Sequence, residues 1–184
     1  MRRLLLLLLA LAVVTACGGG GGGGGGGPTT PPPPPPPGIT FTSDGTAGSN
    51  SIALASGAGS DANTLILTVA ANSVTDLYGV AFDLRYPNNL FRYEGSPVAD
   101  FLNTGGTQVS FNVVEPTPGT LVVGYSRLGS VPGATGSGTL VTLRFTATTA
   151  GSGTFAFDDH TAFNSHGEPI SGLTWVAGRV QVVR

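Results

Sequence analysis

Apolar and polar residues alternate along much of the chain after residue 38, with the two-residue period of a β-strand. In residues 78–86, the side chains of Val80, Phe82, Leu84 and Tyr86 fall on one side, and small or charged residues lie between them. Strict alternation of this kind is typical of a strand with one buried face and one face in water.

The same period recurs at residues 108–114, where Val109, Phe111 and Val113 share one side, and at residues 139–148, where the outward side is polar. No window sustains a helical period. Further strands are predicted at residues 65–70, 90–93, 121–126, 153–158 and 175–183. Short strands joined by Gly- and Pro-rich turns predict an all-β fold, a two-sheet antiparallel β-sandwich of about nine strands.

Composition and motifs argue against two classes of function, nucleic-acid binding and catalysis. The chain has 8 Arg, no Lys and 10 acids, and two of the Arg are residues 2 and 3, so the remainder carries six Arg against ten acids, a net charge of −4. An acidic body without Lys argues against nucleic acid as a partner. The sequence holds no Gly-x-Ser-x-Gly elbow, no phosphate loop, and no nucleophile motif of Ser or Cys near either His. We therefore predict that the protein is not an enzyme.

The first residues form a leader. A basic start at Arg2 and Arg3 precedes an apolar run at residues 4–14, which is shorter than the roughly 20 residues that a membrane-spanning helix needs and suits a secretory signal. Small residues then lead to Cys17, the single cysteine of the chain. This arrangement resembles the bacterial lipoprotein signal, the lipobox. The resemblance implies that residues 1–16 are removed and that Cys17 is acylated. The alternative is an ordinary secretory signal with a chance cysteine.

A linker follows at residues 17–38. Ten consecutive Gly at residues 18–27 predict a flexible coil of roughly 17 Å, and seven Pro at residues 31–37 predict a stiff polyproline rod of roughly 22 Å. The rod could instead be a ligand for a proline-recognising domain. Because the residue after Cys17 is Gly and not Asp, the lipoprotein resemblance implies an exported protein, anchored by lipid at the outer membrane or cell surface.

Five motifs in succession resemble the cohesin domain family. They are the aromatic-rich strand and turn at residues 78–90, the Ser-Phe-Asn of residues 110–112, the Gly-led run at residues 136–145, the stretch at residues 153–170 and the closing strand at residues 175–182. The resemblance covers residues 39–184. It implies a nine-stranded jelly-roll sandwich, an extracellular setting, no catalysis and the binding of a protein partner. In cellulosome scaffolds that partner is the dockerin module of an enzyme.

The resemblance also implies a binding face, on the sheet made from the family's third, fifth, sixth and eighth strands. The expected outward residues are Gly79, Ala81, Asp83, Arg85, Ser110, Asn112, Val122, Gly124, Ser126 and Arg127. At three of these positions the family usually has polar or acidic residues, and this chain has Gly79, Ala81 and Arg127. The residues by which the family recognises a dockerin are therefore absent. We expect a protein partner, dockerin-like or other. The alternatives are an ordinary solvated sheet face and a carbohydrate-binding module that binds polysaccharide on the same architecture. For the latter, Trp175 is the one Trp available for sugar stacking, and a core position suits it better.

The densest polar cluster is predicted to lie between two strands, at Asp158, Asp159 and His160. Together with the oxygens of Asn164 and Glu168 it could offer ligands to Ca²⁺, which takes six to eight oxygens. A zinc site would use His160 and His166, but their spacing on an irregular loop fixes no geometry. The third interpretation is a solvated loop in which Asp caps turns, with no cofactor.

Overall fold

The computed structural model describes residues 35–95 and 97–184. The predictions for the leader, for Cys17 and for the linker up to residue 34 lie outside these residues. Residues 35–184 form one compact unit, and this unit has its own hydrophobic core, so it can be produced and studied by itself. Across the described residues, no helix has the length and apolar character needed to cross a bilayer.

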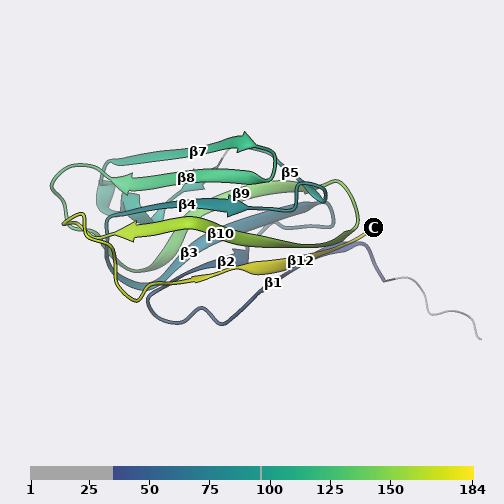
Figure 1. The fold of residues 1–184 in the computed structure, drawn as a ribbon, viewed down its shortest axis with the longest axis horizontal. Helices are drawn as coiled ribbons and strands as arrows, with labels where there is room; N and C mark the ends of the chain where they lie inside the picture. The colour runs from purple at the N-terminus through teal and green to yellow at the C-terminus, as the bar shows by residue number, and fades with distance from the viewer. Residues whose placement is uncertain (1–34, 96) are drawn as a thin grey trace, which may run out of the picture. The chain divides into compact units, whose positions relative to one another are not determined.

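Two six-stranded sheets make up the fold, which confirms the predicted all-β sandwich (Figure 1). The first sheet runs in the order β1 (Gly38–Ser43), β12 (Gly178–Val183), β10 (Gly151–Phe163), β4 (Gly79–Arg85), β8 (Thr120–Arg127) and β7 (Val109–Thr117). The second runs in the order β11 (Thr174–Val176), β2 (Ser51–Ser56), β3 (Thr64–Leu77), β9 (Ala134–Ala147) and β5 (Phe91–Tyr93), and the short β6 (Val98–Ala99) pairs with β9. In Figure 1 the first sheet faces the viewer.

Some elements differ from the sequence prediction. Strands β1 and β2 were not predicted, and a short 3₁₀ helix, η1 (Phe101–Gly106), is present. Its residue Leu102 is buried, and the Leu102 N–H donates to Tyr125 Oη at 3.1 Å. The predicted single strand at residues 175–183 is two strands, because the chain changes sheet at Ala177. Strand β11 pairs in parallel with β2, and β12 pairs antiparallel with β10 and β1.

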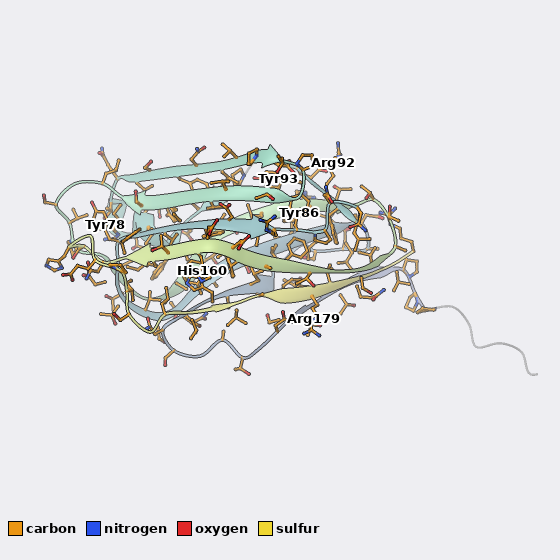
Figure 2. All side chains as sticks on the ribbon, viewed as in Figure 1. Tyr78, Tyr86, Arg92, Tyr93, His160 and Arg179 are labelled. Carbon is orange, nitrogen blue, oxygen red and sulfur yellow. The ribbon has the colours of Figure 1, made fainter. Side chains whose placement is uncertain are left out.

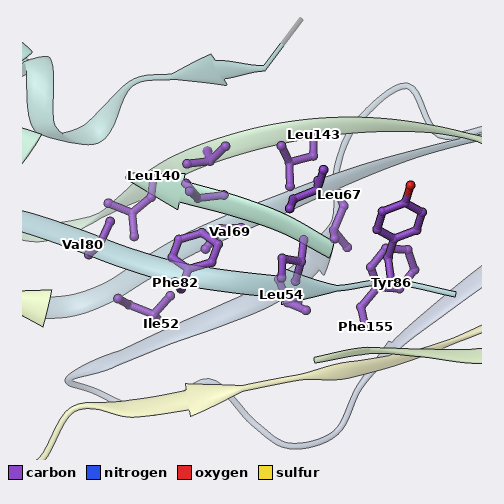
Figure 3. Close-up of a cluster of buried hydrophobic side chains, with 14 of the residues drawn as sticks. Ile52, Leu54, Leu67, Val69, Val80, Phe82, Tyr86, Leu140, Leu143 and Phe155 are labelled. Carbon is purple, nitrogen blue, oxygen red and sulfur yellow. The ribbon is translucent and has the colours of Figure 1, made fainter. Parts of the chain in front are cut away.

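Aromatic rings fill one end of the space between the sheets. Phe155 of β10 is fully buried, and its ring centroid lies 5.2 Å from that of Phe145 and 5.7 Å from that of Phe91. The rings of Phe41 and Tyr86 lie at 6.1 and 6.4 Å. Figure 3 shows Phe155 and Tyr86 close together at this end, with aliphatic side chains such as Leu54 and Leu143 beside them. Offset and edge-to-face ring contacts add to the stabilisation that burial gives.

A β-bulge interrupts β10 where it pairs with β4. Asp158 lies opposite Asp83, but the next paired residue is Thr161, opposite Ala81. Two residues of β10, Asp159 and His160, therefore lie opposite one residue of β4, Phe82. Asp159 adopts a φ of 40°, in the left-handed region that non-glycine residues rarely occupy. Because one residue is added, the alternation of the strand is reversed after the bulge. Phe155 faces the core, whereas Phe163 lies opposite Gly79 and faces outward.

Asp76 joins three segments at the other end of the sandwich. Its carboxylate accepts hydrogen bonds from the Gly133 N–H at 2.7 Å and from the Ser165 hydroxyl at 2.8 Å. The bond from the Ser165 side chain, helped by the backbone N–H groups of Gly133 and Ser165, lowers the pKa of Asp76. A Cβ at position 133 would lie 2.3 Å from the Asp76 backbone, so this close approach requires glycine. The loops at this end are thus fixed to the strands.

Candidate functional site

The outward residues of four neighbouring strands, β10, β4, β8 and β7, form one continuous surface, which we call the outer face. Gly79 and Ala81 of β4 lie opposite Ser126 and Gly124 of β8. Ser110 and Asn112 of β7 lie opposite the same two residues of β8. On the other side of β4, Phe163 and Thr161 of β10 lie opposite Gly79 and Ala81. The register therefore aligns small and polar side chains in two rows across four strands.

A hollow of about 300 Å³ lies where these two rows meet. Its lining includes Gly79, Ala81, Ser110, Asn112, Gly124, Ser126 and Phe163. A Cβ added at Gly124 would meet no atom within 4 Å, so the absence of a side chain there leaves open space above the strand. At Gly79, by contrast, an added Cβ would approach the Ser126 Cβ at 3.1 Å. Packing within the sheet therefore favours glycine at position 79 but not at position 124.

Exposed apolar side chains extend from the hollow. Val114 of β7 is 45% exposed and Val122 of β8 is 37% exposed, and the two lie directly opposite each other. Leu128, at the end of β8, is 46% exposed. In the described part of the chain these three and Val98 are the exposed large hydrophobic residues. An apolar surface of this kind, rimmed by polar groups, is typical of an interaction site.

Charged residues lie at the same end of the outer face as Val122 and Val114, because Asp83 of β4 is directly opposite Val122 of β8. Asp83 and Asp158 are directly opposite each other on β4 and β10, an arrangement of like charges that is unfavourable by itself. The Nε of Arg85 lies 2.7 Å from Asp158 Oδ2, and both side chains are about half exposed or more, at 62% and 47%. The hydrogen bond to Asp158 raises the pKa of Arg85. Asp83 and Asp159 form no ion pair within residues 35–95 and 97–184.

Seven of the eight residues that the sequence assigned to partner binding lie on the outer face. They are Gly79, Ala81, Asp83, Arg85, Asn112, Gly124 and Ser126. Arg127 does not, and its assignment was wrong. It follows Leu121, Val123 and Tyr125 in the alternation of β8, so it points toward the interior and is only 7% exposed.

The buried Arg127 has a structural role. Its guanidinium donates to the Pro132 carbonyl at 2.8 Å and to Thr104 Oγ1 at 3.0 Å. These bonds connect the end of β8 to the following loop and to η1. Since the side chain is enclosed, it is not available to a partner on the outer face.

The predicted cation cluster does not form a site. Within residues 35–95 and 97–184, no three His, Asp, Glu or Cys side chains gather in a group that could hold a metal ion. Asp158, Asp159 and His160 lie inside strand β10 and not in a loop between strands, and the bulge separates the direction of His160 from that of Asp158. Asp158 engages Arg85. The ring of His160, which is labelled in Figure 2, lies against that of Trp175, with centroids 4.7 Å apart.

The loop at residues 164–168 contains Asn164 and Glu168, the other two expected cation ligands, and their side chains form hydrogen bonds within the loop. The side-chain oxygen of Asn164 accepts from the backbone N–H groups of His166 and Glu168, and its amide donates to the Glu168 carboxylate at 3.1 Å. These bonds are those of a polar turn, but the residue that makes them is Asn164 and not one of the aspartates that the sequence suggested.

Trp175 belongs to the packed interior and is not a sugar-stacking platform. Its ring centroid lies 4.9 Å from Phe157 and 5.7 Å from Phe82, and His160 covers it from the side of β10. The structure supports the core interpretation of this residue. Two aromatic residues are among those that line the hollow near Gly124. Tyr125 is buried, so Phe163 is the one whose ring is available to a ligand.

Two contributors to the outer face were not identified from the sequence. Val114 could have been found, because Val109, Phe111 and Val113 face inward and the next residue must face outward. Phe163 could not, because simple alternation from Phe155 places it in the core. Only the bulge at residues 158–161 turns it outward.

Comparisons with known proteins agree with this fold. A family model described as the cohesin domain matches residues 52–182. The solution structure of CaCohA2 from Clostridium acetobutylicum has a TM-score of 0.56 at 17% identity, over 73% of this chain and 92% of that chain. A type II cohesin, A11 from Bacteroides cellulosolvens, has a TM-score of 0.57 at 14% identity, over 72% and 96%.

A third structure contains a bound partner. The sixth cohesin of scaffoldin B from Acetivibrio cellulolyticus, solved in complex with a mutant Cel5 dockerin, has a TM-score of 0.54 at 15% identity, over 70% of this chain and 97% of that chain. At these identities the likeness shows the fold alone. A comparison of the sequence with curated proteins found no match.

Proposed function

Because the chain belongs to the cohesin domain family, we propose that residues 35–184 are a non-catalytic module that binds a protein partner through the outer face of β10, β4, β8 and β7. The hollow over Gly124 carries this proposal, because it combines open space with exposed apolar neighbours. Cohesin neighbours with a dockerin partner support a protein as the ligand.

The chemistry of the outer face fits a protein better than a small substrate. The hollow is shallow and is lined by backbone, hydroxyl and amide groups with one aromatic ring. Protein interfaces combine an apolar centre with a polar rim in this way. Val114 and Val122 extend the apolar area along the strands beyond what a small ligand would cover.

Affinity capture tests this function. Residues 35–184, immobilised on resin and exposed to the exported proteins of the source bacterium, are expected to retain a defined set of proteins, identified by mass spectrometry. The double variant Ala81→Arg/Gly124→Arg is expected to lose that set to background, because two long cationic side chains would fill the hollow.

A matched control keeps the same added charge on the same sheet. Thr40→Arg/Thr154→Arg changes two exposed strand residues on the half of the sheet formed by β1, β12 and β10, and it should capture the same proteins as the wild type. If the Ala81→Arg/Gly124→Arg variant also captures that set, the outer face near the hollow is not the binding site.

We propose further that the module is exported and anchored through a lipid on Cys17. The single cysteine directly after small residues that follow an apolar run supports this proposal. Mass spectrometry of the mature protein from membranes is expected to show an N-terminal Cys17 with a diacylglycerol thioether, and Cys17→Ser should release the protein from the membrane fraction. A mature chain with a free Cys17 thiol in the soluble fraction would contradict lipid anchoring without affecting the binding proposal.

A further inference from the structure

The outer face has two chemically different halves that are close together. Along β4, the hollow at Ala81 and the acidic end at Asp83 are two residues apart, which is about 7 Å along a strand. Both residues point outward on the same strand. A bound segment that covers the hollow therefore also reaches the acidic end.

The acidic end carries an uncompensated negative charge. Three carboxylates, Asp83, Asp158 and Asp159, lie near one cation, Arg85, and the charge of each raises the pKa of that guanidinium, so the local charge is −2. Only Asp158 is paired with Arg85. The whole chain beyond Arg2 and Arg3 contains no Lys and is also acidic. Both the local and the overall field favour a cationic group on the partner.

The hollow suits a different kind of partner side chain, one that is large and apolar. The open space above Gly124 and the neighbouring apolar side chains of Phe163 and Val122 offer contacts to a large apolar side chain. A side chain of that kind in a pocket at the centre of an interface gives much of the binding energy. The cation at the rim would add specificity and a faster association rate.

We infer that the partner presents one large aromatic or aliphatic side chain to the hollow over Gly124 and a Lys or Arg about 7 Å away, against Asp83 and Asp159. This inference rests on the proposed function and specifies the partner's chemistry. The spacing corresponds to two residues along an extended segment or three to four residues along a helix. The partner segment therefore carries an apolar residue and a basic residue at one of these spacings.

A peptide selection tests the inference and needs no isolated partner. Random 16-residue peptides displayed on phage are selected for binding to residues 35–184. Peptides that also bind the variant Gly124→Thr, in which a neutral side chain enters the hollow, are removed by counter-selection. The surviving peptides are expected to be enriched in a large apolar residue with Lys or Arg at the stated spacing. Their affinity should fall at high salt, because the rim charges are exposed.

A pair of charge variants separates the two halves of the face. Asp83→Asn/Asp159→Asn should weaken the selected peptides about 5- to 10-fold, and Asn is compatible with the left-handed backbone at position 159. The control Asp44→Asn/Glu94→Gln removes the same charge from acids that pair with Arg179 and Arg92, away from Asp83, and should leave the affinity within twofold.

The possible outcomes distinguish a failure of this inference from a failure of the proposed function on which it rests. Peptides that depend on Gly124 but lack a basic residue, and that bind the Asp83→Asn/Asp159→Asn variant as well as the wild type, would overturn the inference and leave the binding face in place. If no peptide survives the counter-selection, because every peptide that binds the wild type also binds Gly124→Thr, both the inference and the binding face are overturned.

Discussion

Replacing Gly124 by threonine is expected to weaken partner binding by about 10- to 100-fold and, at the same time, to stabilise the fold. A side chain at this position enters the hollow, and the partner must then shift or lose its contact there, at a cost of about 1–3 kcal/mol. A Cβ added at this position would meet no atom of the sheet within 4 Å. Glycine inside a strand costs about 0.5–1 kcal/mol, and threonine is a good strand residue.

Two measurements on one variant check this prediction. Calorimetric binding of a captured partner gives the affinity, and thermal unfolding gives the stability, which should rise by roughly 2–3 °C in Tm. The control Gly48→Thr changes another glycine with open space around it, in the loop between β1 and β2, and should not alter the affinity. Unchanged binding by Gly124→Thr would mean that the hollow is not occupied in the complex.

Replacing Phe155 by alanine is expected to lower the free energy of unfolding by about 3–5 kcal/mol. The ring is fully buried and contacts four other aromatic rings that come from both sheets. Its removal leaves a cavity between the sheets that the rigid strands cannot close. Since Phe155 directly precedes the part of β10 that pairs with β4, weaker packing there also loosens the support of the outer face.

Urea unfolding followed by tryptophan fluorescence measures this effect, because Trp175 is the single Trp of the chain and packs against the core. Val114→Ala serves as the control, since that side chain is 45% exposed, and should change the stability by no more than about 0.5 kcal/mol. A loss below about 1.5 kcal/mol for Phe155→Ala would show that the two sheets do not meet at this cluster.

Alternation is a good guide wherever one face of a strand is buried and its register is regular. Strands β4, β7 and β8 follow the predicted inward and outward pattern in their central parts, and β9 follows it from Val141 to Ala147. For this reason the sequence alone groups the small and polar residues of the outer face correctly. Arg127 is the exception, because a charged residue is rarely buried, although alternation by itself places it inside.

The features that could not be predicted depend on contacts between distant segments. The bulge in β10 adds one residue only relative to its partner β4, so the pattern of β10 alone does not reveal it. Likewise, nothing local marks Ala177 as the point where the chain leaves one sheet for the other. The bulge decides that Phe163 lines the hollow, and both features together decide that His160 lies against Trp175, away from Asp158 and Arg85.

The central claim is that the outer face of β10, β4, β8 and β7 binds a protein. Hydrogen exchange of residues 35–184, measured by mass spectrometry with and without a captured partner, tests it most directly. We expect slower exchange in β4, β7 and β8, largest around Ala81, Asn112 and Gly124, and no change in β2 and β3. Protection confined to the sheet of β2, β3 and β9, with β4 and β8 unaffected, would contradict the claim.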